Sequence, residues 1–165
     1  MFKVAIITAS DKGAIGERID TSGQLIIDMM TEAGYEIHGK VILPDDRATL
    51  SEAMVALCDD EKVDLILTTG GTGFSPRDWT PEATKDIIER DVPGIPEAMR
   101  YYSLQITPKA MLSRSVAGIR GKTLIINLPG SPKAVKENLG FVMPALEHGL
   151  EILIGKASEC GSSPK

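Results

Sequence analysis

Cysteine, histidine and tryptophan are scarce in this chain of 165 residues, which contains two, two and one of them. Cys58 and Cys160 lie far apart, and neither has a second cysteine or histidine at the spacing of zinc ligands. Zinc knuckles, CxxC redox pairs and disulfide frameworks are therefore excluded, and a reducing, cytoplasmic setting is expected. His38 and His148 belong to separate segments, which argues against an HExxH metal site and a Ser-His-Asp triad.

Positive charge and long apolar runs are also in short supply. Lysine and arginine number 18 against 23 acidic residues, giving a net charge of -5 without the basic stripe that nucleic-acid binding needs. Aliphatic runs such as residues 4–7 are only a few residues long, against the roughly 20 that a membrane span requires. We expect no nucleic-acid partner, no signal peptide and no membrane span, and one domain over residues 1–156 with a short polar tail over 157–165.

Short apolar segments alternate with amphipathic ones along the chain. The segments typical of strands are 2–9, 35–43, 63–68, 115–119 and 122–128, the last two forming a hairpin or two sheet edges. Between them we expect helices that begin near Asp20, at a capping box over residues 49–52, at Thr80 before Pro81, near Pro96 and at Ser131 before Pro132, with a last helical run over 140–154. This alternation predicts an α/β fold, a three-layer α/β/α sandwich with a mostly parallel central sheet.

Polar loops follow four predicted strands, where a parallel sheet places its ligand site. These loops are Ser10-Asp11 with the glycine-bearing stretch after it, Pro44-Asp45-Asp46, residues 68–80 and residues 127–132. Residues 68–73 combine three threonines with three glycines, which permit positive φ and expose backbone N–H groups, so this loop predicts either a phosphate cradle or a tight structural turn. It is neither a Walker loop nor GxGxxG.

Asp45 and Asp78 are the carboxylates that these loops offer for chemistry. Such residues are either solvated turn carboxylates and helix caps or ligands for magnesium, which takes one or two carboxylates together with substrate phosphates. Asp11 and Asp46 are weaker candidates by the same reasoning. Lys133, in the first turn of a predicted helix, is either solvated or balanced by an anionic ligand. Trp79, next to Asp78, serves either packing or ligand contact.

Three motifs in order carry a resemblance to a known family. They are TTGGTGFSPRDWTP with EAT after it (residues 68–84), AMLSR (110–114) and INLPGSP (126–132). Together with Ser10-Asp11 and the turn over 20–23, they closely resemble the MogA/MoaB family of molybdenum cofactor biosynthesis. The resemblance covers about residues 3–155.

The resemblance implies an enzyme that transfers AMP from ATP to the terminal phosphate of molybdopterin and releases pyrophosphate, with Mg²⁺ as the expected ion. It implies Asp45 and Asp78 as catalytic and metal-binding residues and Gly70, Gly71, Thr72 and Gly73 as the nucleotide-binding loop. Its pterin- or phosphate-binding residues are Ser10, Asp11, Arg77, Ser113, Arg114, Pro129, Gly130 and Ser131. A homotrimer or a hexamer, with the apolar residues of 101–111 or the last helix at the interface, and hand-over to a molybdenum insertase are also implied.

The scarcity of general bases agrees with that reaction. A phosphomonoester has a second pKa near 6, so it is mostly a dianion at pH 7 and attacks without a base. Two other functions remain open for the same fold. One is nucleotide pyrophosphatase activity, as in the related competence-damage family, and the other is pterin binding or scaffolding without catalysis.

Overall fold

The computed structural model describes residues 1–156, so the predicted polar tail over 157–165, with Cys160, lies outside the described residues. In chain order the elements are β1 (Lys3–Ala9), α1 (Asp11–Ala14), α2 (Thr21–Glu32), β2 (Glu36–Leu43), α3 (Arg47–Asp59), β3 (Leu65–Thr69), α4 (Thr80–Lys85), β4 (Arg90–Asp91), α5 (Gly94–Leu104), the 3-10 helix η1 (Pro108–Leu112), β5 (Ala117–Arg120), β6 (Thr123–Leu128) and α6 (Pro132–Leu153). No helix in this range is long and apolar enough to cross a membrane.

The strands form one sheet in the order β2-β1-β3-β6-β5-β4. The neighbours β2, β1, β3 and β6 pair in parallel, whereas β5 is antiparallel to both β6 and β4. The predicted mostly parallel sheet is therefore confirmed, and β5 and β6 form the hairpin, one of the two arrangements that the sequence left open. The sequence did not predict the short helix α1, the two-residue strand β4 or the helix η1.

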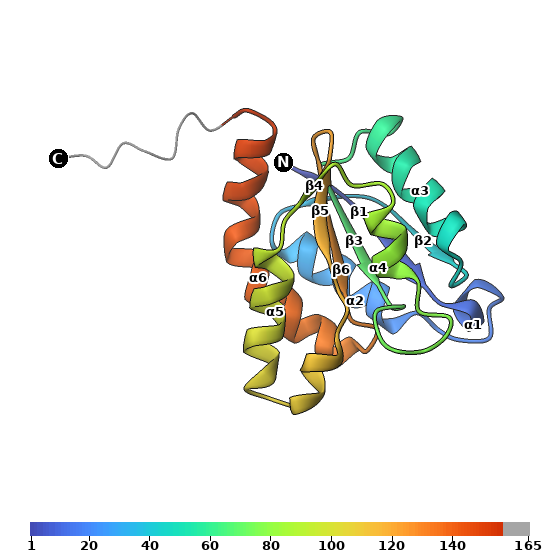
Figure 1. The fold of residues 1–165 in the computed structure, drawn as a ribbon. Coiled ribbons are helices and arrows are strands. Elements are labelled where there is room, and N and C mark those ends of the chain that lie inside the picture. The colour runs from blue at the N-terminus through green and yellow to red at the C-terminus, as the bar shows by residue number, and fades with distance from the viewer. Residues whose placement is uncertain (157–165) are drawn as a thin grey trace.

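Alternating side chains of the central strands divide the core into two layers. Val4 and Ile6 of β1 pack in the cluster that includes residues of α2, α5 and α6, while Ala5 and Ile7 pack in the cluster that includes residues of α3 and α4. Figure 1 shows these two sets of helices on opposite faces of the sheet. The predicted three-layer sandwich is confirmed, because strands buried on both faces need helices on both sides.

Two helix starts differ from the prediction. The N-cap of α3 is Asp46, whose carboxylate accepts from the Thr49 backbone N–H at 2.8 Å, so the helix starts before the predicted capping box. The N-cap of α4 is Trp79, without a side-chain hydrogen bond, and Thr80 is already helical. The backbone N–H of Thr80 donates to the Gly71 carbonyl at 3.2 Å, so the preceding loop rather than a capping side chain sets the start of this helix.

The C-terminal helix also differs from the prediction. α6 runs without interruption from Pro132 to Leu153, where the sequence suggested a separate run from Gly140. Its buried residues continue at helical spacing through the glycine and through Pro144, and they are Val135, Asn138, Leu139, Val142, Leu146 and Leu150. Packing of this stripe outweighs the local penalties of the two helix-breaking residues. The predicted cap of this helix is confirmed, since the Ser131 hydroxyl accepts from the Ala134 N–H at 3.2 Å.

Candidate active site

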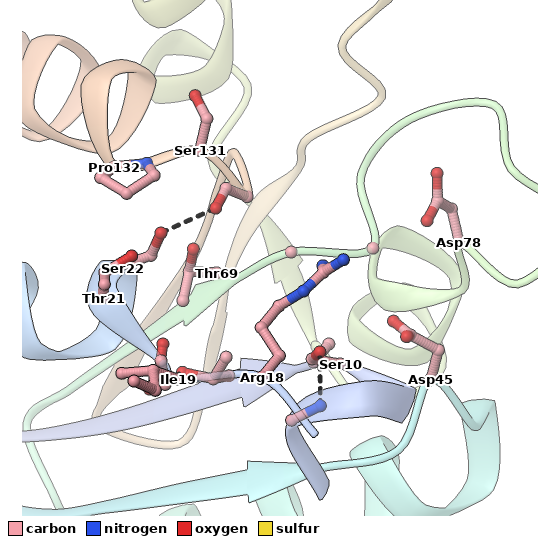
Figure 2. A pocket seen from close by; sticks show the side chains of 17 residues that line it. Ser10, Arg18, Ile19, Thr21, Ser22, Asp45, Thr69, Asp78, Ser131 and Pro132 are labelled. Atoms are coloured by element: carbon pink, nitrogen blue, oxygen red, sulfur yellow. Dashed lines mark hydrogen bonds between the residues drawn. The ribbon is translucent and has the colours of Figure 1, made fainter. Parts of the chain in front are cut away.

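A cavity of about 510 Å³ opens at the carboxyl ends of β1, β3 and β6 (Figure 2). Its lining residues are Thr8, Ala9, Ser10, Gly13, Arg18, Ile19, Asp20, Thr21, Ser22, Asp45, Thr69, Gly70, Gly71, Asp78, Gly130, Ser131 and Pro132. Seven of the residues predicted for the site are among them: Ser10, Asp45, Gly70, Gly71, Asp78, Gly130 and Ser131. All four predicted loops thus contribute to one cavity.

Gly70 and Gly71 form the wall between β3 and the rest of the cavity. Both have left-handed backbones, with φ of 92° and 66°. A Cβ at Gly70 would lie 2.4 Å from the Ala9 carbonyl oxygen, and one at Gly71 would lie 2.3 Å from the Thr80 hydroxyl. Neither position accommodates a side chain, so this segment presents bare backbone to the cavity, as a loop that holds phosphate must.

Asp45 is held by a reciprocal pair of hydrogen bonds with Asp11. The Asp11 N–H donates to the Asp45 carboxylate and the Asp45 N–H donates to the Asp11 carboxylate, both at 2.9 Å. Arg77 donates to both oxygens of Asp11 at 3.0 and 2.9 Å, and these bonds are the main reason that the pKa of Asp11 lies below its ordinary value. Asp11 therefore contacts Asp45 directly and Arg77 contacts Asp11, and neither residue lines the cavity itself.

Asp45 carries negative charge that the protein does not fully neutralise. Burial is the main cause that raises the pKa of this carboxyl, the charges of Asp11 and Asp78 raise it further, and the Asp11 N–H and the Arg77 charge oppose the change. Its Oδ1 faces Gly71, 3.3 Å from where a Cβ on that glycine would stand. An electropositive group in the cavity would relieve this charge.

Asp78 lies near the end of the loop between β3 and α4, and Arg114 holds the backbone of this loop. The Asp78 carboxylate accepts from the Ser75 N–H at 2.9 Å. Arg114 donates to the carbonyl oxygens of Gly73 and Asp78, both at 2.7 Å, and it pairs with Glu82. Arg114 therefore supports the backbone of this loop and does not line the first cavity; its ligand binding, which the resemblance implied, stays a prediction.

A buried polar network ties this loop to the sheet. The Asn127 side-chain amide of β6 donates to the hydroxyls of Thr68 at 3.1 Å and of Thr84 at 2.9 Å. Thr84 in turn donates to the Thr80 carbonyl at 2.9 Å. Because all four residues are buried, these bonds strongly favour one position of α4 against β3 and β6.

The opposite wall contains residues that sequence reasoning missed. Arg18 is the only cation among the lining residues, and Figure 2 shows its side chain reaching into the middle of the cavity. The hydroxyl of Thr69 donates to the Pro129 carbonyl at 2.7 Å, and that of Ser22 donates to the Gly130 carbonyl at 2.7 Å. These bonds join the end of β3 and the start of α2 to the loop that follows β6. The signal for Arg18 was its place in the glycine-bearing stretch after β1, but its direction depends on the fold.

A second cavity, of about 280 Å³, lies beside the loops that follow β3 and β6. Four predicted site residues line it, namely Thr72, Gly73, Ser113 and Pro129. Met99 and Leu112 give it apolar walls, and polar groups come from Ser103 and Asn138, whose side chains are 3.2 Å apart in a hydrogen bond. A partly apolar pocket with a few fixed polar groups is typical of small-molecule sites.

The donor set of the first cavity fits magnesium. Within residues 1–156 no cluster of three or more His, Cys, Asp and Glu side chains has a metal-binding arrangement, so a complete protein cage is not present there. Asp45 and Asp78 nevertheless offer carboxylate oxygens to the same space, and the pKa of Asp45 is raised mainly by burial and further by the charges of Asp11 and Asp78. Two carboxylates suit Mg²⁺, because this ion prefers oxygen ligands and fills its other coordination positions with water and substrate phosphates.

Comparison with known proteins gives a consistent result. Residues 5–148 match the model of a family described as a probable molybdopterin binding domain. A molybdopterin adenylyltransferase of Helicobacter pylori strain J99 is 41% identical over 155 residues, which cover 92% of this chain and 88% of that protein. Gephyrin of Dictyostelium discoideum is 44% identical over 163 residues, covering 93% of this chain but 23% of gephyrin. The crystal structure of the molybdopterin biosynthesis enzyme MoaB of Thermus thermophilus superposes with a TM-score of 0.89 at 48% identity, covering 96% of this chain and all of that one.

Proposed function

The chain belongs to the molybdopterin-binding family of molybdenum cofactor biosynthesis that includes MogA and MoaB, and on this premise we propose that it is a molybdopterin adenylyltransferase. The proposed reaction joins the terminal phosphate of molybdopterin to the α-phosphorus of ATP and releases pyrophosphate. The observation that carries it is the meeting of Asp45 and Asp78, from two different loops, in one cavity beside the bare backbone of Gly70 and Gly71.

The reaction needs little covalent chemistry from the protein. The attacking phosphate is already mostly a dianion at pH 7, so no general base is required. No histidine or cysteine lines the described first cavity, which suits a reaction of this kind. The remaining requirements are to align two anionic substrates and to offset charge on the departing pyrophosphate.

We assign the ATP phosphates to the first cavity and the pterin to the second. The first cavity has the backbone of Gly70 and Gly71, the Arg18 cation and the N-terminus of α6 at Ser131, all of which favour phosphate. The second has apolar walls and fixed polar groups, which favour a flat heterocycle. The loops over 70–73 and 129–130 contribute residues to both cavities. The terminal phosphate of molybdopterin would therefore extend past these loops to reach the ATP in the first cavity.

Asp45 and Asp78 would hold Mg²⁺ when the nucleotide binds. The ion would supply positive charge to the phosphate oxygens, and the chain itself would align the substrates. Asp11 and Arg77 hold Asp45, Ser75 and Arg114 hold Asp78, and Arg18 would face the phosphates. Lys133 lies in the first turn of α6, where a bound anion would favour its position.

Substituting the two aspartates tests this proposal. We expect Asp45→Asn and Asp78→Asn to fold normally but to transfer AMP to molybdopterin at least about 100-fold more slowly, because the charge that holds the ion is lost. Asp46→Asn is the matched control, since asparagine also caps helices and the carboxylate of Asp46 already serves the N-cap of α3. Adenylyl-molybdopterin formation, followed by chromatography, is the measurement. Turnover by both variants at the rate of the unsubstituted enzyme would overturn the assignment.

We propose further that the enzyme is cytoplasmic, acts as a trimer or hexamer and passes its product to a molybdenum insertase. Support for self-association comes from residues 101–112, which span the end of α5, the following turn and η1. Their exposed apolar side chains are Tyr101, Tyr102, Leu104, Ile106, Met111 and Leu112. Exposed apolar side chains concentrated in one segment favour a protein interface there.

A further inference from the structure

Arg47 makes an ion pair between two helices whose preceding loops contain the proposed catalytic aspartates. It is the first residue of α3, two positions after Asp45. Its Nε and Nη2 donate to the two carboxylate oxygens of Asp86, each at 2.6 Å. Asp86 is the C-cap of α4, the helix that follows Asp78. The pair therefore connects the two segments that must hold Asp45 and Asp78 at a fixed separation.

The same guanidinium also lies over Trp79. The Arg47 Cζ is 5.8 Å from the centre of the indole ring, within the range of cation–π contacts. Trp79 follows Asp78 directly and is the N-cap residue of α4. Arg47 thus contacts α4 at both ends, through the ring at its start and the carboxylate at its finish.

Helix preferences alone do not explain these charges. A cation in the first turn of a helix and an anion at the last turn are both opposed by the helix dipole. Arg47 occupies the first position of α3 and Asp86 occupies the C-cap of α4, so each is unfavourable in its own helix. What they share is the contact with each other, which joins the two loops.

We propose that Arg47 is a positioning residue that fixes the distance between Asp45 and Asp78 by joining their loops through Trp79 and Asp86. The proposal rests on the proposed function. Arg47 does not line the cavity, so it acts through the two aspartates and not by contact with substrate. A displacement of about 1 Å in a reacting geometry costs up to 100-fold in rate, so a planar, bidentate clamp at this point has a measurable consequence.

Arg120, the last residue of β5, provides a matched comparison, because its side chain joins the end of α3 to the segment that follows α4. It donates to both carboxylate oxygens of Asp59, at 2.6 to 3.2 Å, and to the Ile87 carbonyl at 3.0 Å. Asp59 is the last residue of α3, so this second clamp lies at the end of that helix away from the site. Loss of either clamp affects the attachment of α3, but only the loss of Arg47 should affect the aspartates.

The test compares Arg47→Lys with Arg120→Lys in the full chain. Lysine keeps the charge but lacks the planar fork that pairs in bidentate fashion and stacks on an indole. We expect Arg47→Lys to lower kcat about tenfold or more with KM for Mg-ATP changed less than threefold, and Arg120→Lys to leave both within twofold. The emission of Trp79, the only tryptophan, should change in Arg47→Lys without any ligand and stay unchanged in Arg120→Lys.

A kcat within twofold of the unsubstituted enzyme for Arg47→Lys, or an equal loss in both variants, would overturn the proposal. If the unsubstituted protein forms no adenylyl-molybdopterin, the proposed function fails by itself. The ligand-free emission then decides on the contact, because identical Trp79 spectra for Arg47→Lys and the unsubstituted protein would show that Arg47 does not hold this loop.

Discussion

Asp45 shows at the scale of one residue how the site sets function against stability. The fold takes this carboxylate out of water, gives it one backbone N–H and places Asp11 and Asp78 near it. Burial is the main cause that raises the pKa of Asp45, and the charges of Asp11 and Asp78 raise it further, so the folded state holds its proton more tightly than the unfolded chain does. Stability from this group is therefore present below its ordinary pKa of 3.8 and is lost as the pH rises through the raised value.

Asp45→Asn should accordingly unfold at a higher temperature than the unsubstituted protein at neutral pH, although we expect it to transfer AMP far more slowly. The difference should shrink as the pH falls through the raised pKa and vanish below about 3.8. Asp11→Asn is the opposite control: its pKa is lowered, so this substitution should destabilise the protein at neutral pH, with the effect fading in acid. Thermal unfolding followed between pH 3 and 8 measures both, and a less stable Asp45→Asn at neutral pH would contradict the electrostatic account.

The location of a single site residue could be predicted where it directly follows a strand of the parallel sheet. Asp45 and Gly70 follow predicted strands, and the parallel sheet brings them to one edge. The sequence did not reveal that Arg114 holds the loop by its carbonyls, because that contact joins residues 41 and 36 positions apart. Arg18 was missed for a similar reason, since the direction of its side chain depends on how the stretch after β1 folds.

At the scale of elements, order and type were predictable, and so were the N-caps of α2 and α6 at Asp20 and Ser131, but other boundaries were not. Apolar periodicity predicts α6, but Gly140 and Pro144 suggest a break that the buried stripe overrides. The Thr80-Pro81 pair predicts a helix with Thr80 as its N-cap, but the N-cap of α4 is Trp79, one residue earlier. The hydrogen bond from the Thr80 N–H to the Gly71 carbonyl shows that the preceding loop sets this start. In both cases a contact with a distant segment outweighs a local preference of about 1 to 3 kcal/mol.

Pro144 should therefore limit the stability of α6. It cannot donate to the Gly140 carbonyl four residues earlier, and it lies on the exposed face of the helix. We expect Pro144→Ala to raise the free energy of unfolding by about 1 to 3 kcal/mol. Gly140→Ala is the control, because its added Cβ meets nothing within 4 Å and the expected gain is only about 1 kcal/mol. Denaturant titration measures both, and a destabilised Pro144→Ala would show that the proline is required by the packing.

At the scale of the whole molecule, the proposed function requires an acidic chain to bind two anionic substrates. The net charge of -5 opposes their approach, and the first cavity adds Asp20, Asp45 and Asp78 to its wall. The fold compensates locally, with Arg18, the backbone of Gly70 and Gly71, and the start of α6. Mg²⁺ would supply the remaining positive charge, which makes the ion a requirement of the proposed reaction and not an accessory.

The release of pyrophosphate from Mg-ATP by the purified protein, measured with and without molybdopterin, decides whether the chain is a molybdopterin adenylyltransferase. We expect release only when molybdopterin is present, with one adenylyl-molybdopterin formed per pyrophosphate, and none when Mg²⁺ is removed by a chelator. Pyrophosphate release at the same rate without molybdopterin would instead indicate hydrolysis by water. Molybdopterin binding with no pyrophosphate release under any of these conditions would indicate a binding protein, and either result would contradict the account.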